Sequence, residues 1–207
     1  MIDSTREIRS ATVAELRAGG GELPVLEGYA AVFDEPSQPI GGFFVEHIEP
    51  GAFSRALTTA PDVRALVDHD PSRILGRTTS GTLSLKEDRH GLLATIQPPD
   101  TSTGRDIVES VRRGDVSQMS FAFGVAEGGQ RWESREDGDH RFLSDLDLFD
   151  VSVVTYPAYE STEVSTRTLE EWNTHQGHRM NAQVREVLAG QKKHLDRFGY
   201  NDPARRL

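Results

Sequence analysis

The chain has 207 residues, of which 33 are acidic and 23 are basic, giving a formal net charge of −10 at pH 7. Since binding to a phosphate backbone needs clustered Lys and Arg, this balance argues against a nucleic-acid partner. The absence of cysteine excludes disulfide bonds, thiolate zinc sites and a cysteine nucleophile. The sequence has neither a run of about 18 apolar residues nor the apolar core of a signal peptide, so we expect no membrane segment and a cytoplasmic location.

The first part of the chain predicts a leader followed by strands. Residues 1–22 are polar and end near three consecutive glycines, which favours a flexible leader. Residues with high β-propensity at 24–33 and 43–48 predict two strands, and Pro50 lies where the first turn of a short helix tolerates it. We expect the main folded domain to cover residues 23–165.

The middle of the chain shows both strand and helix patterns. The apolar run at 63–70 predicts a strand, and residues 81–97 indicate a hairpin with a charged turn. Residues 98–115 are typical of a helix, because Thr103 begins a capping-box pattern and Gly114 stands where glycine commonly ends a helix.

A later strand separates bulky from small side chains. In residues 116–125 the bulky Met119, Phe121 and Phe123 alternate with smaller residues, one of which is Ser120. Because successive side chains of a strand point to opposite faces, we expect the bulky set in the core and Ser120 on the other face.

The last predicted strand carries a carboxylate within an apolar run. Residues 127–141 mix charges and glycines and favour a solvated loop or hairpin tip. In residues 143–157, alternation predicts Asp150 and Ser152 on one face and three apolar side chains on the other, namely Phe149, Val151 and Val153.

The remaining residues, 166–207, are polar with helical spacing and predict an appended tail. Strands dominate the rest of the chain and helices are few. We therefore predict a mainly β, α+β architecture, in which a mixed β-barrel is surrounded by short helices.

Without cysteine or a glycine-rich phosphate loop, three kinds of chemistry stay open: acyl transfer by a hydroxyl, hydrolysis by a metal, or none. The seven histidines form no HExxH motif, and His175 and His178 lie in the predicted tail, so we expect neither a metal nor a cofactor. A serine nucleophile needs a general base and a group that orients that base. Ser120, His69 and Asp150 have the side chains for these roles.

Each of these three residues also has a purely structural interpretation. Ser120 can be a strand serine bonded to nearby backbone, and His69 an ordinary surface histidine. Asp68 and Asp70 flank His69 and favour its protonated form if they lie close to it. Asp150 is costly to bury unless it has a partner such as an imidazole, whereas an edge position removes that cost.

Six segments, taken in order, resemble the prohead serine protease family of tailed bacteriophages. They are EGYAAVF, FFVEHIEPGAF, VRALVDHDPSRILGRT, GTLSLKEDRHGL, SQMSFAFGV and LFDVSVVTYPAY. That family is related in fold to the herpesvirus assembly proteases, so the resemblance implies a β-barrel with a serine–histidine active site.

The resemblance also assigns residue roles. By position, Ser120 matches the nucleophile of the family and His69 its general base. Asp150 stands where many relatives have a glutamate as the third member, and Ala122 stands where a glycine is common. Arg77 is either an additional electrostatic contributor or part of a structural salt bridge.

The resemblance implies a biological role as well. Such an enzyme acts inside the assembling prohead in the host cytoplasm, where it cleaves scaffold and major capsid protein segments and then itself. The polar tail suits self-cleavage or scaffold docking, and relatives in the viral branch suggest a homodimer. The alternatives are a catalytically inactive head-assembly protein with the same fold and, more distantly, an unrelated β-barrel binding module.

Overall fold

The computed structural model describes residues 6–10, 16–19, 24–59, 61–156 and 166–177. Contacts divide the chain into two units, Met1–Ser165 and Thr166–Leu207. In the second unit the described part is helix α3 (Thr166–Gly177). Among the described residues, no helix has the length and apolar character needed to cross a membrane.

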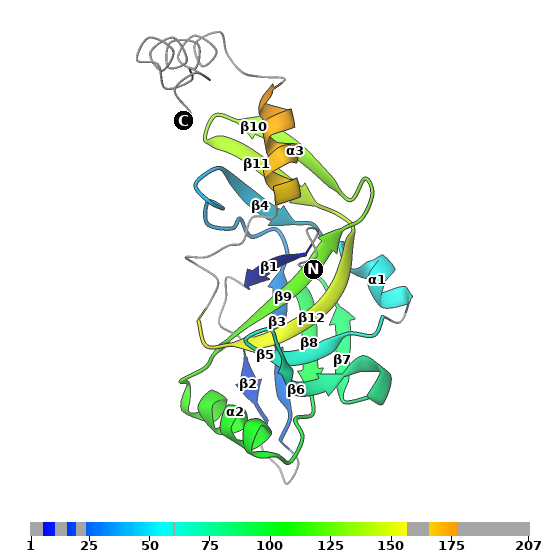
Figure 1. The fold of residues 1–207 in the computed structure, drawn as a ribbon, viewed down its shortest axis with the longest axis vertical. Helices are drawn as coiled ribbons and strands as arrows, with labels where there is room; N and C mark the ends of the chain where they lie inside the picture. Colours follow the sequence, from blue (N-terminus) through cyan, green and yellow to red (C-terminus); the bar gives the residue numbers. More distant parts are fainter. Residues whose placement is uncertain (1–5, 11–15, 20–23, 60, 157–165, 178–207) are drawn as a thin grey trace, which may run out of the picture. The chain divides into compact units, whose positions relative to one another are not determined.

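A five-stranded sheet forms the centre of the first unit (Figure 1). Strand β12 pairs antiparallel with β9 and parallel with β5, so the sheet is mixed. In spatial order its strands are β1 (Glu7–Ser10), β9 (Gln118–Val125), β12 (Leu146–Val154), β5 (Arg64–Val67) and β6 (Asp70–Arg77).

Two smaller sheets are also present in the described part of the first unit. The four-stranded sheet consists of β2 (Arg17–Ala18), β3 (Leu26–Val32), β8 (Gly91–Ile96) and β7 (Leu83–Glu87), in that order. The three-stranded sheet consists of β10 (Gln130–Arg135), β11 (Gly138–Leu143) and β4 (Phe44–Ile48). The segment interpreted as a loop or hairpin tip at 127–141 is therefore a β10–β11 hairpin whose second strand pairs in parallel with β4.

Three helical segments accompany these sheets among the residues that the structure describes. They are α1 (Ser54–Thr58), the 3-10 turn η1 (Thr78–Ser80) and α2 (Ser102–Arg113). Helix α2 confirms the helix predicted from the sequence, but its N-cap is Thr101, whose hydroxyl accepts a hydrogen bond from the Gly104 amide at 3.3 Å. Gly114 ends the helix with a φ of 80°, as its position indicated.

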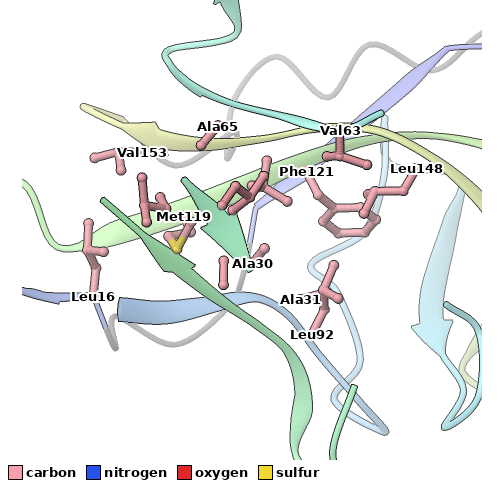
Figure 2. Packing of buried hydrophobic residues seen from close by; sticks show 14 of the residues in the cluster. Leu16, Ala30, Ala31, Val63, Ala65, Leu92, Met119, Phe121, Leu148 and Val153 are labelled. Carbon is pink, nitrogen blue, oxygen red and sulfur yellow. The ribbon is translucent and has the colours of Figure 1, made fainter. Parts of the chain in front are cut away.

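The prediction of a mainly β fold with few helices is confirmed, whereas the described strands do not close into one hydrogen-bonded barrel. The five-stranded and four-stranded sheets share one apolar core instead of joining edge to edge. Figure 2 shows this core, in which Met119 and Phe121 of β9 lie among Ala30, Ala31 and Leu92 of the other sheet. Burial of both inner faces in this way stabilises two packed sheets without closure.

The prediction of a flexible leader at 1–22 is wrong for its described parts. Residues Glu7–Ser10 form β1, which pairs antiparallel with β9, and Arg17–Ala18 form β2, which pairs with β3. The polar composition of β1 suggested an exposed segment. Glu7 and Arg9 are instead buried as ion-paired groups, 3% and 6% exposed respectively.

Candidate active site

Ser120 lies in the middle of β9, on the face opposite the bulky core residues. As the alternation predicted, its neighbours Met119 and Phe121 are buried in the apolar core. The Ser120 Oγ lies 2.7 Å from His69 Nε2 and 2.8 Å from the backbone oxygen of Arg9 in β1. The serine itself is only 1% exposed. Its hydroxyl therefore has two acceptors within reach, one of which is a histidine.

His69 is held in a tight turn between β5 and β6. Val67 pairs with Asp70, so Asp68 and His69 are the two central residues of this hairpin, with φ values of 50° and 57°. Positive φ at both positions is the geometry of a type I′ turn, and Asp and His tolerate it better than most residues.

The turn is anchored to the neighbouring strand β12. The Asp68 amide donates to the Val153 oxygen at 2.9 Å, and the Asp68 carboxylate accepts from the Thr155 amide at 2.8 Å. These bonds offset the strain of the turn and fix the imidazole over the sheet.

Asp150 reaches His69 because β12 contains a bulge. The register with β9 shifts between Leu148 and Asp150, and Phe149 is left 37% exposed instead of sharing the core face with Val151 as predicted. A bulge changes which face the following side chains occupy. It turns Asp150 away from the core, and its Oδ1 lies 2.6 Å from His69 Nδ1.

The Asp150 carboxylate has two further partners, both missed by the sequence reasoning as contributors to the site. The hydroxyl of Ser152 donates to Asp150 Oδ1 at 3.0 Å and accepts from the His69 amide at 3.2 Å. Arg6 Nη2 lies 2.5 Å from Asp150 Oδ2. Only the placement of Ser152 two residues after Asp150, on the same face, could have indicated its role.

The three predicted residues thus form one hydrogen-bonded series. A carboxylate at Nδ1 favours the tautomer that carries its hydrogen there, which leaves Nε2 free to accept a proton from Ser120. Because a hydroxyl has one hydrogen, Ser120 donates either to His69 or to the Arg9 carbonyl at any moment. Donation to His69 is the arrangement that activates a serine for attack on a carbonyl carbon.

The acidic residues beside His69 in the sequence are engaged elsewhere. Asp70 accepts from the Ser72 hydroxyl and amide at 2.7 Å and 2.9 Å, and these bonds hold the pKa of Asp70 below its usual value. Asp68 bonds to Thr155. The carboxylate that contacts the imidazole is that of Asp150.

Arg77 takes part in a salt bridge with Asp62. Its guanidinium donates to the Asp62 carboxylate at 2.6 Å and 2.7 Å. These bonds lower the pKa of Asp62 to about 2 and raise that of Arg77. The contacts of Arg77 therefore agree with a structural salt bridge, which was one of the two interpretations of this residue.

The chain was compared with solved structures, curated proteins and protein-family models. A search of solved structures finds the capsid assembly protease gp21 of bacteriophage T4, with 10% sequence identity and a TM-score of 0.47, over 73% of this chain and 99% of the other. Curated proteins give no match. The model of the Caudovirus prohead serine protease family matches residues 10–175, which is most of the chain and includes Ser120, His69 and Asp150. This chain is a member of the Caudovirus prohead serine protease family.

Proposed function

We propose that the protein is a serine endopeptidase in which Ser120 is the nucleophile, His69 the general base and Asp150 the group that orients the base. The observation that carries the proposal is the hydrogen-bonded series of these three side chains, with distances of 2.7 Å and 2.6 Å. Membership of a serine protease family supports the same assignment.

The proposed reaction proceeds through an acyl-enzyme. His69 Nε2 takes the Ser120 proton while Oγ attacks the peptide carbonyl, and the imidazolium formed is stabilised by the Asp150 carboxylate. The protonated His69 then gives its proton to the leaving amine. Water, activated by the same imidazole, hydrolyses the ester and restores Ser120.

The family description supports the maturation of proheads as the setting for this chemistry. We infer that the substrates are scaffold and major capsid protein segments, and that the enzyme also cleaves itself. The second unit, Thr166–Leu207, is a candidate for removal or scaffold docking because it forms a contact unit of its own. A homodimer stays a prediction from the resemblance.

Co-expression with the cognate capsid protein tests the proposal. The parent chain, the Ser120→Ala variant and a Ser117→Ala control are each expressed with that protein, and the intact masses of all chains are measured. Ser117 serves as the control because it is a nearby serine that directly precedes β9 and is three residues from Ser120. We expect shortened capsid or scaffold chains with the parent and with Ser117→Ala, and unshortened chains with Ser120→Ala. Identical masses in assembled particles from all three would instead indicate an inactive head-assembly protein.

A further inference from the structure

Strand β1 lies where it brings a peptide bond of this chain to the proposed nucleophile. It forms one edge of the five-stranded sheet and pairs antiparallel with β9, with Ser10 opposite Ser120 and Arg9 opposite Phe121. The Arg9 carbonyl oxygen is 2.8 Å from Ser120 Oγ. Of the β1 residues, Arg9 therefore presents its carbonyl to the nucleophile, and the bond that follows that carbonyl joins Arg9 to Ser10.

The side chains of β1 enter a buried charged subsite. Glu7 and Arg9 point to the same face, since they are two residues apart in a strand. Arg9 binds Glu46 of β4 through Nε at 2.7 Å and Nη2 at 3.2 Å, which is a forked contact. Glu7 binds Arg141 of β11 through both carboxylate oxygens, at 2.8 Å and 2.9 Å.

Without β1, the two remaining charged residues of the subsite, Glu46 and Arg141, still form an ion pair with each other. Arg141 also binds Glu46 directly, at 2.9 Å, and the two are neighbours in the parallel register of β11 and β4. Removal of Glu7 and Arg9 together takes away one negative and one positive charge, so the remaining pair stays neutral. Such a pair can bind another strand with the same two charges in the same order.

Extended peptides commonly bind proteins in this way, by adding a strand to a sheet edge with alternate side chains in pockets. Ser120 is 1% exposed with β1 in place, and the Arg9 carbonyl contacts its hydroxyl. A substrate strand added to β9 at this edge would therefore take the place of β1.

We propose that β1 occupies the substrate site of the enzyme, and that Glu46 and Arg141 determine its specificity. Glu46 selects an arginine immediately before the cleaved bond, and Arg141 selects a glutamate two residues earlier. The Arg9–Ser10 bond is then a self-cleavage site. This proposal rests on the proposed function and adds the substrate class to it.

The self-cleavage step uses only groups already described and one water molecule. Ser120 Oγ bonds to the Arg9 carbonyl carbon and its proton passes to His69 Nε2. The bond between that carbon and the Ser10 nitrogen breaks, and the nitrogen takes the proton from His69. Water then hydrolyses the Arg9 ester. The products are a peptide ending in the Arg9 carboxylate and a chain beginning at Ser10.

Intact-mass analysis of the purified full chain gives the first test. We expect the parent to yield a species that begins at Ser10 and the Ser120→Ala variant to keep residues 1–9. A parent that keeps residues 1–9 while it labels with a fluorophosphonate at Ser120 and shortens the capsid chain would overturn this inference and leave the proposed function intact. No Ser120-dependent labelling or cleavage at all would overturn the proposed function itself.

Peptides test the specificity without altering the enzyme, which avoids the risk that buried charge variants fail to fold. The reference peptide has the sequence of residues 5–14, TREIRSATVA, and is incubated with the parent chain. We expect cleavage between Arg and Ser. Reversing either charge, by Arg9→Glu or Glu7→Lys in the peptide, should lower kcat/KM about 10- to 100-fold, as expected for loss of charge-assisted hydrogen bonds.

Two further peptides sharpen this test. Arg9→Lys should lower kcat/KM about tenfold, because an ammonium cannot reproduce the forked contact with Glu46. Ile8→Val is the matched control, since residue 8 faces away from the charged subsite, and its rate should stay within about twofold. Cleavage at another bond, or equal rates for the charge-reversed peptides, would overturn the assignment of Glu46 and Arg141.

Discussion

Replacement of Asp150 by asparagine tests the proposed role of this carboxylate with little change in shape. The carboxylate is 4% exposed and accepts hydrogen bonds from His69, Arg6 and Ser152. An asparagine that turns its amide nitrogen to His69 donates to Nδ1 and so forces the ring hydrogen onto Nε2. That tautomer cannot accept the Ser120 proton. The same substitution in other serine proteases with a triad lowers kcat by about 10⁴, and we expect a loss of about 10³ to 10⁴ here.

The assay is cleavage of the cognate capsid protein or of the TREIRSATVA peptide, with kcat and KM determined separately. With the capsid protein, KM should change little, because the carboxylate acts by orienting the histidine. With the peptide, KM should also rise, because the variant lacks the charge that pairs with Arg6. Asp147→Asn is the matched control: it lies in the same strand before the bulge, its side chain is 52% exposed and it pairs with Arg55. Its activity should stay within about twofold of the parent. An Asp150→Asn variant within about tenfold of the parent would refute the orienting role.

Three further predictions follow from the described contacts. Ser152→Ala removes the hydroxyl between Asp150 and the His69 amide and should lower kcat about 2- to 12-fold with KM unchanged, as steady-state kinetics would show. Phe53→Ala removes a side chain that is 0% exposed and should lower the free energy of unfolding in urea by about 3–5 kcal/mol, whereas Tyr156→Ala, at an 83% exposed position, should change it by less than about 0.5 kcal/mol. The pKa of Asp62 is about 2, against an ordinary 3.8, because Arg77 binds its carboxylate. A depressed acid pKa stabilises the fold above the ordinary value, so the difference in urea midpoint between the parent and Asp62→Asn should be constant above about pH 5 and shrink as the pH falls toward 2. A difference that grows on acidification would contradict this assignment.

Periodicity predicted the central strands well because their burial follows a regular alternation. Met119 and Phe121 face the apolar core in β9, and Ser120 lies on the opposite face, as the sequence indicated. The helix at Ser102–Arg113 could also be predicted from the sequence, since an apolar stripe and a terminal glycine are local signals.

Strand β1 could not be predicted in the same way. Its sequence, EIRS, has charged residues at the positions that become buried. That burial is favourable because each charge has a partner that is distant in the sequence. Arg9 pairs with Glu46, 37 residues away, and Glu7 pairs with Arg141, 134 residues away. A hydropathy pattern contains no information on such distant pairing, so polarity was interpreted as exposure.

The candidate site depends on two departures from regular strand geometry, and this explains why residue roles came from the family resemblance and not from periodicity. The turn at Asp68 and His69 places two successive residues at positive φ, and the bulge at Phe149 reverses the alternation before Asp150. Each non-glycine residue at positive φ costs about 1–3 kcal/mol, which the fold tolerates only where surrounding bonds hold it. Here the bonds from Asp68 to Val153 and Thr155 do so, and they tie the turn to the strand that carries Asp150. The same contacts that stabilise the irregular backbone therefore set the distance between the histidine and its carboxylate.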